Sequence, residues 1–175
     1  MARTQDKIEL LKVIAHRFNE TKIVWALGAS MLLYFKGITS EFHDIDLMVV
    51  ETDIAKVQNI LSEMGQIQPH NPNSKYQTKI FLEYIIDCID VDVMAGFSII
   101  KDGKAIDCSL KEDQIVERML LGEELIPLQD IRLWLEYYRL MDRHEKVQMI
   151  ERAMRQPNSC FPKERNRTAH EQQIR

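Results

Sequence analysis

The first half of the chain shows helical and strand-like hydrophobic patterns in turn. Over Thr4–Asn19 apolar residues recur at the spacing of an amphipathic helix. A short β-prone run, Lys22–Leu27, ends at Gly28, and the apolar segment after it predicts a helix over Ala29–Lys36. The next expected strand is Asp44–Val50. This order predicts strands that alternate with helices.

Strand signals return after a polar loop. A helix that Thr52 caps and Gly65 ends is expected first, followed by a loop over Gln66–Lys75, which is rich in Pro, Asn and Ser. Two adjacent strands, Gln77–Ile86 and Cys88–Phe97, are predicted next. The sheet is therefore expected to gain neighbouring strands in the middle of the chain.

Two hairpins are predicted further along the chain. Asp102-Gly103 is the turn expected in the first, and Leu121-Gly122-Glu123 is the turn expected in the second. The strands expected to pair are Ile99–Ile100 with Ala105–Cys108, and Gln114–Leu121 with Glu124–Ile126. A helix through Val116–Leu121 remains an alternative to the second hairpin.

Helices are predicted to close the fold. Pro127 and Asp130 introduce one that runs to Met141, and another is expected over about His144–Met154. The polar segment Gln156–Arg175 is expected to be a mobile tail. We therefore expect an α/β (α+β) fold in one domain, residues 1–155, with a mixed β-sheet flanked by helices and further helices at the C-terminal end.

Length and net charge favour a single globular domain and disfavour broad nucleic-acid binding. A chain of 175 residues with 45% hydrophobic content can build one ordinary globular domain. Its net charge of −4 gives no strong nucleic-acid signal, because proteins that bind nucleic acid broadly are usually basic. The longest apolar run, Ile23–Phe35, is too short to cross a membrane, which takes ~20 residues. A small polyanionic ligand neutralised by a metal remains compatible with this charge.

Cysteine usage and the N-terminal segment predict a cytoplasmic protein. Cys88, Cys108 and Cys160 are widely spaced and odd in number, so neither a closed disulfide set nor a metal-ligand pattern is expected. Charged residues in Met1–Leu11 interrupt the apolar core that an export signal needs. Cys88 is expected to be a buried strand residue, because no histidine lies near it in sequence to activate it as a nucleophile.

Two Asp-x-Asp pairs carry the first chemical signal. The period of a strand places Asp44 and Asp46 on one face of an otherwise apolar run. Two carboxylates on one face repel each other unless a cation lies between them, and Mg²⁺ prefers such oxygen ligands while leaving positions for substrate phosphates. Asp90 and Asp92 repeat the pattern on a later strand. The alternative for each pair is a solvated strand edge without a metal.

A tight turn lies upstream of the aspartates. The segment Leu27-Gly28-Ala29-Ser30 ends a strand and enters a helix, where free N–H groups, the helix dipole and a serine hydroxyl can meet phosphate. A close-packed bend without a ligand is the commoner use of such a turn. The turn also lacks the lysine and the spacing of a Walker-type loop.

Taken in order, three segments resemble the motif of the nucleotidyltransferase superfamily: Leu27-Gly28-Ala29-Ser30, then Asp44-Ile45-Asp46, and later Val91-Asp92-Val93. The sequence looks closest to the small antibiotic-nucleotidyltransferase and toxin-type branches. The segment from Tyr138 to Lys146 is also similar to the helical close of those proteins. The resemblance covers about residues 22–152 and implies the nucleotidyltransferase fold.

The resemblance also implies a reaction and a role for each site residue. The implied reaction transfers a nucleoside monophosphate, above all AMP from ATP, to a hydroxyl of a small molecule or protein and releases pyrophosphate. The residues implied to be catalytic and to hold Mg²⁺, or Mn²⁺, are Asp44, Asp46 and Asp92. Those implied to bind the nucleotide are Gly28, Ala29, Ser30, Lys36 and Arg143. In the second pair, Asp92 rather than Asp90 aligns with the third carboxylate of the family.

A catalytically inactive binding or regulatory module of the same fold, such as a toxin–antitoxin component, is the alternative. The segment Gly37–His43 lacks the basic residue that many relatives carry just before the aspartates. The charge of a triphosphate would then have to be compensated by Lys36, Arg139, Arg143 or Lys146.

Other chemically capable residues are expected to be structural. His43 and His144 are more often solvated than metal-bound in such positions. The aromatic residues Trp134, Tyr137 and Tyr138 could stack on a nucleobase, but their helical spacing is more typical of core residues.

Overall fold

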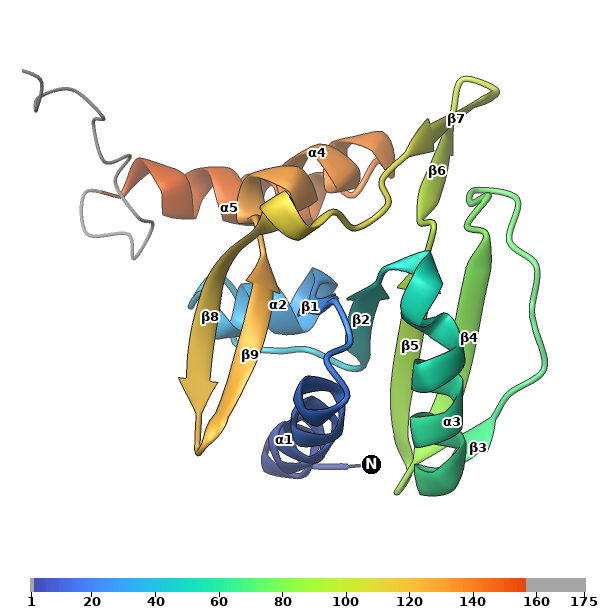
Figure 1. Ribbon diagram of the computed structural model, residues 1–175. Coiled ribbons are helices and arrows are strands. Elements are labelled where there is room, and N and C mark those ends of the chain that lie inside the picture. The colour runs from blue at the N-terminus through green and yellow to red at the C-terminus, as the bar shows by residue number, and fades with distance from the viewer. Residues whose placement is uncertain (1, 157–175) are drawn as a thin grey trace, which may run out of the picture.

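A seven-stranded mixed sheet forms the centre of the protein (Figure 1). The computed structural model describes residues 2–156. The strand order is β3-β4-β5-β2-β1-β9-β8, and a separate hairpin pairs β6 with β7. The strands are β1 Trp25–Leu27, β2 Ile45–Val49, β3 Gln66–Ile67, β4 Ile80–Ile86, β5 Ile89–Ala95, β6 Ser98–Lys101, β7 Lys104–Asp107, β8 Ile115–Leu121 and β9 Glu124–Gln129. The pairs β2–β5 and β1–β9 are parallel, and the other pairs are antiparallel.

Helices cover the sheet and its upper edge in Figure 1. They are α1 Thr4–Glu20, α2 Ala29–Phe35, α3 Ile54–Met64, α4 Ile131–Leu140 and α5 His144–Arg155, with short 3₁₀ turns at Glu51–Asp53 and Glu112–Gln114. Helix α1 packs against β9 and α3, while α2 packs against β2 and α4. Helices α4 and α5 pack against each other across the top of the sheet in this view. The structure therefore confirms the expected mixed sheet flanked by helices.

The central strand β2 is buried along its whole length. Its apolar residues, together with those of α1 and α2, form one hydrophobic core. Within that core Phe18 of α1 meets the edge of the Trp25 ring of β1, with ring centroids 5.6 Å apart. Because both faces of β2 are covered, a polar side chain on this strand must face either the core or an enclosed cavity.

Local chemistry explains where the elements at the ends of the chain begin. At the start of α1, the Asp6 carboxylate accepts hydrogen bonds from the backbone N–H and the guanidinium of Arg3, which satisfies the backbone donor of the N-cap residue. At α4, the Asp130 side chain accepts a hydrogen bond of 2.9 Å from the Arg132 N–H, so that Asp130 is the N-cap.

Two expected boundaries around helices were wrong. Pro127 lies inside β9 opposite Arg118, where we expected it to introduce the helix; the strand continues to Gln129 before α4 begins at Ile131. A proline can stand in a strand where no ladder hydrogen bond needs its N–H. Thr52 lies within a 3₁₀ turn, and Asp53 precedes the first residue of α3.

Three further expectations need correction. Gln66–Ile67 is a short strand paired with β4, not part of the loop. Residues Val116–Leu121 belong to β8, which excludes the alternative helix. Cys88 is exposed in the β4–β5 turn rather than buried in a strand, because Asp87 and Cys88 both adopt the positive φ angles of a tight hairpin turn.

The polar segment expected to be a tail lies, apart from Gln156, outside the described residues. Among residues 2–156, no helix combines the length and the apolar character that a membrane crossing requires.

Candidate functional site

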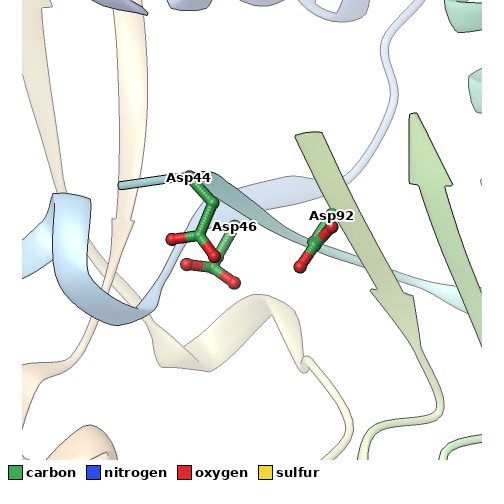
Figure 2. Close-up of side chains that lie close together, drawn as sticks. All are labelled: Asp44, Asp46 and Asp92. Carbon is green, nitrogen blue, oxygen red and sulfur yellow. The ribbon is translucent and has the colours of Figure 1, made fainter. Parts of the chain in front are cut away.

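Three aspartates converge at the centre of the sheet (Figure 2). Asp44 immediately precedes β2, Asp46 lies on β2, and Asp92 lies on the neighbouring strand β5. The parallel pairing of these strands sets Asp46 directly opposite Asp92. One carboxylate oxygen from each aspartate lies within 4.8 Å of the other two. The structure thus brings together the three residues that the sequence resemblance implied to be metal ligands.

The surroundings of the aspartates disfavour their negative charges. Asp46 is only 9% exposed, and no hydrogen bond or ion pair of its carboxylate occurs within residues 2–156. Burial, followed by the nearby charges of Asp44 and Asp92, holds the pKa of Asp46 well above its usual range. Burial also raises the pKa of Asp92 to about 7, with smaller contributions from Asp44, Glu83 and Asp90. Such a group of buried carboxylates is stabilised when a cation neutralises it.

Asp90 is separated from this group although it shares a strand with Asp92. It is exposed and lies opposite Ile85 of β4. The three-aspartate cluster does not include it. The geometry therefore places Asp92, and not Asp90, beside Asp44 and Asp46.

A cavity of about 520 Å³ opens beside the cluster. Asp46 and Asp92 form part of its floor on the sheet, and Ala29 contributes from the start of α2. Trp134 and Tyr138 of α4 line it as well as belonging to the core. Burial raises the pKa of the Tyr138 hydroxyl far above its usual range, with smaller effects from Asp46 and Asp44, so this hydroxyl stays protonated and can donate.

The turn from β1 into α2 is fixed against the aspartate strand. The Gly28 N–H donates a 3.0 Å hydrogen bond to the carbonyl of Asp46. A Cβ atom at Gly28 would lie 2.5 Å from Cζ2 of Trp134, so the close approach of α4 requires glycine at this position. Ala29 has a φ of 46°, in the left-handed region, and lines the cavity. Ser30 is partly exposed in the first turn of α2, where helix geometry leaves the N–H groups without intrahelical acceptors.

Of the basic residues that the sequence suggested for phosphate, some line the cavity and others lie outside it. Arg143 lines the cavity, and so does Lys146, one turn further along the chain. Lys36 does not line it, because its ammonium group forms an ion pair with Glu117 of β8. Arg139 is likewise engaged outside the cavity, with Glu136 and Glu151. The structure thus brings Arg143 to the aspartates' cavity and leaves Lys36 apart from it.

Several cavity residues were missed by sequence reasoning. Glu83 of β4 lies opposite Asp92 and lines the cavity. Loop residues His70, Asn71 and Asn73 line it too, because the chain leaves β3 beside Glu83 and returns across the opening. A lone glutamate in an apolar strand and a polar loop carry no motif. The strand pairing that places them at the site cannot be read from spacing along the chain.

The remaining candidates have no place in the cluster or the cavity. His43 and His144 do not belong to the aspartate cluster. Tyr137 packs in the core, with its hydroxyl 3.4 Å from the carbonyl of Cys108. A second hollow, of about 750 Å³, lies between α1 and the β4–β5 turn and contains none of the three aspartates.

Solved structures show the same arrangement of elements. Neither a protein-family model nor a curated protein sequence matches the chain. A putative nucleotidyltransferase from Thermotoga maritima superposes with a TM-score of 0.66 at 22% identity, over 87% of this chain and 95% of that one. ANT(2")-Ia, in complex with adenylyl-2"-tobramycin, gives 0.58 at 12% identity, over 85% and 90% of the two chains.

A third structure extends the comparison. The lincosamide antibiotic adenylyltransferase LnuA, with lincomycin bound, gives a TM-score of 0.57 at 12% identity, over 86% of this chain and 97% of that one. At these identities the likeness concerns the fold, and its coverage extends across nearly the whole of each neighbour. The chain therefore has the fold of the nucleotidyltransferase superfamily, as the order of its glycine turn and its three aspartates predicted.

Proposed function

We propose that this protein transfers a nucleoside monophosphate from a nucleoside triphosphate, ATP in the first instance, to a hydroxyl group of a small molecule or protein. The observation that carries the proposal is the convergence of Asp44, Asp46 and Asp92, because Asp46 and Asp92 line a cavity that Arg143 and Lys146 also line. Negative groups that can hold a metal and positive groups that can hold phosphate then face the same space. The two adenylyltransferase neighbours support the choice of ATP.

The three carboxylates fit a divalent cation. They provide hard oxygen donors close together, and the buried Asp46 carboxylate has no other partner in the described part of the chain. When bound there, Mg²⁺ or Mn²⁺ would neutralise the triphosphate and stabilise the charge that develops during transfer. Asp44 and Asp46 are the proposed ligands from β2, and Asp92 is the proposed ligand from β5.

The phosphates are proposed to bind between the glycine turn and the start of α5. Ala29 and Ser30 bring backbone N–H groups, and Ser30 a hydroxyl, to the side on which Ala29 lines the cavity. Gly28, whose own N–H is bonded to the Asp46 carbonyl, holds this turn beside the aspartates. Arg143 and Lys146 supply positive charge. We place Lys146 in the role that the resemblance implied for Lys36, because Lys36 is occupied by Glu117.

Asp92 is proposed to act on the acceptor. Its carboxylate accepts the proton of the acceptor hydroxyl while the hydroxyl oxygen forms a bond to the α-phosphorus. The bond from the α-phosphorus to the bridging oxygen breaks, and pyrophosphate leaves on the opposite side. Asp92 suits this role because it lines the cavity beside the β2 aspartates and is less buried than Asp46.

The inactive-module alternative rests on the absence of a basic residue in Gly37–His43. Side chains of Asp44, Asp46 and Asp92 that pointed away from one another would favour the inactive module. Their convergence, together with the two cations at the cavity, favours transfer instead.

The direct test combines binding with turnover. Calorimetry with ATP, in Mg²⁺ and in EDTA, should show binding that requires the divalent ion, and Asp44→Ala/Asp46→Ala should lose this metal-dependent binding. ATP, CTP, GTP and UTP are then offered with Mg²⁺ or Mn²⁺ and a panel of hydroxyl compounds, and pyrophosphate release is measured. Equal ATP affinity with and without the metal would contradict the proposal.

A further inference from the structure

We propose that Lys101, which lies outside the cavity, positions Arg143 for the triphosphate through an ion pair with Asp142. The inference rests on the proposed function, which assigns phosphate binding to Arg143. It starts from the β6–β7 hairpin, which stands apart from the seven-stranded sheet and provides none of the described residues that line the cavity. Lys101 is the last residue of β6.

The turn that carries Arg143 is short. Helices α4 and α5 are joined by only three residues, 141–143. Asp142 has a φ of 56°, in the left-handed region, where the chain turns sharply between the helices. The N–H of Arg143 donates a 2.9 Å hydrogen bond to the carbonyl of Tyr138. In so short a turn, the direction in which the Arg143 side chain leaves the backbone depends on how Asp142 is held.

Asp142 is held by Lys101. The ammonium group lies 2.8 Å from each oxygen of the carboxylate. These hydrogen bonds hold the pKa of Asp142 below its ordinary value, with smaller effects from His144 and Lys75, so the carboxylate is charged at neutral pH. A charge-assisted contact to both oxygens restricts the rotation of the carboxylate as well as its position. Lys101 therefore restrains the residue next to Arg143.

The place of Lys101 is fixed by the hairpin. In Figure 1, β6 and β7 rise beside α4, and β6 contacts this helix. The Ile100 N–H donates a 2.9 Å hydrogen bond to the carbonyl of Lys75. The Gln77 N–H donates one of 3.1 Å to the carbonyl of Ser98. Both bonds join β6 to the segment between β3 and β4, part of which lines the cavity, so the hairpin is a fixed support from which Lys101 reaches the α4–α5 turn.

The contacts of Lys101 rule out a direct role on phosphate. It is not among the described residues that line the cavity, and its ammonium group is engaged by Asp142. Its effect on a bound triphosphate therefore has to pass through Asp142. By charge alone, loss of the Asp142 carboxylate would strengthen ATP binding, because like charges repel. Loss of a group that positions Arg143 would weaken ATP binding instead.

The variant Asp142→Asn decides between these two effects in the full chain. Asparagine tolerates a positive φ angle, so the turn is kept while the charged contact with Lys101 is lost. Calorimetry with ATP in Mg²⁺ should show an affinity about threefold lower than that of the wild type, although a negative charge has been removed. Unchanged or tighter ATP binding overturns the inference.

Lysine variants on the hairpin provide the matched comparison. Lys101→Ala should weaken ATP binding about threefold, whereas Lys101→Arg, which can contact both carboxylate oxygens, should bind ATP like the wild type. Lys104→Ala removes the same charge from the opposite strand, where Lys104 is exposed and has no ion-pair partner among residues 2–156. It should also bind like the wild type. An equal loss in the two alanine variants would mean that only the overall charge matters, and it overturns the inference.

A second substitution shows whether the effect passes through Arg143. Arg143→Ala should itself weaken ATP binding, and in that background Asp142→Asn should cause no further loss, because the positioned group is absent. The single variants at the ion pair should melt within about 4 °C of the wild type, since the pair is partly exposed to solvent. A loss of affinity in Asp142→Asn that persists in the Arg143→Ala background overturns the inference.

Failure of the proposed function gives a different result in the same calorimetry. A wild-type chain that binds ATP equally in Mg²⁺ and in EDTA, or not at all, contradicts the proposed function, and the inference fails with it. Metal-dependent ATP binding by the wild type, together with no loss in Asp142→Asn, overturns the inference alone.

Discussion

Asp46 and Asp92 lie directly opposite each other on the adjacent parallel strands β2 and β5. The two residues are 46 positions apart in the sequence (92 − 46). They lie side by side only because these two strands pair. The pairing places two partly or fully buried carboxylates side by side and next to Asp44. Folding therefore assembles an arrangement of charge that is unfavourable unless a proton or a cation neutralises it.

We expect the metal-free protein to lose stability as the pH rises. The pKa of Asp92 is raised to about 7 in the fold from an ordinary value of 3.8, so the folded chain holds this proton more tightly than the unfolded chain does. The resulting stabilisation is complete below pH ~4 and is lost as the pH rises through 7. The raised pKa of Asp46 acts in the same direction. Melting temperatures in EDTA should therefore fall between pH 5 and pH 8, and Mg²⁺ should restore stability most at pH 8.

The variant Asp92→Asn isolates the contribution of this carboxyl. It should melt above the wild type at pH 8 in EDTA, and the difference should shrink toward pH 5. Asp90→Asn is the matched control, because Asp90 is exposed and outside the cluster. If the Asp92→Asn and wild-type melting temperatures differ by the same amount at both pH values, Asp92 does not titrate in this range.

The same two variants test the catalytic assignment. Asp92→Asn should lower transfer activity about 10²-fold or more, because a group that takes the acceptor proton acts mainly on the chemical step. Metal-dependent ATP binding should be largely retained. Asp90→Asn should have a much smaller effect, since its side chain does not reach the cluster. A larger loss in Asp90→Asn, measured in the same assay, would reverse the assignment.

The elements that hold the aspartates could be predicted because their signals are local. Strand alternation placed Asp44 and Asp46 together, and the glycine turn and later Asp92 completed a recognisable order. Glu83 could not be found in this way. Its place beside Asp92 follows from the register of β4 on β5, which depends on contacts across the whole sheet.

Two predictions that were based on single residues, Pro127 and Lys36, differ from the structure. Pro127 was interpreted as a helix start, but it lies in β9 because tertiary packing continues the strand to Gln129. Lys36 was grouped with the nucleotide-binding residues because its charge could compensate that of a triphosphate. In the fold α2 directs it toward β8, where Glu117 pairs with it. Which group pairs with a long charged side chain depends on the tertiary fold and cannot be inferred from neighbours in sequence.

The glycine turn should tolerate change at one position and not at its neighbour. In Gly28→Ala, the new Cβ would lie 2.5 Å from Cζ2 of Trp134. That ring cannot easily move, because it is buried and its Nε1 donates a 2.9 Å hydrogen bond to Gln129. We expect the melting temperature to fall on the order of 5 °C.

Ala29→Gly provides the opposite change one residue away. Ala29 has a φ of 46°, where glycine is not strained, so this variant should melt no lower than the wild type. Thermal unfolding of the two variants in parallel checks both statements. Gly28→Ala melting with the wild type would show that α4 can move away from the turn.

The two lysines should separate phosphate binding from structural support. Lys146 lines the cavity and has no ion-pair partner among residues 2–156, so Lys146→Ala should weaken metal-dependent ATP binding roughly tenfold without a large loss of stability. The Lys36 side chain is almost fully buried against Glu117, so Lys36→Ala leaves that carboxylate without its partner. This variant should have a lower melting temperature, while its ATP affinity should change less than about threefold.

Calorimetry and thermal unfolding of both variants distinguish the roles. A larger loss of ATP affinity in Lys36→Ala than in Lys146→Ala would restore the role that the sequence resemblance implied for Lys36 and remove Lys146 from the proposed phosphate site.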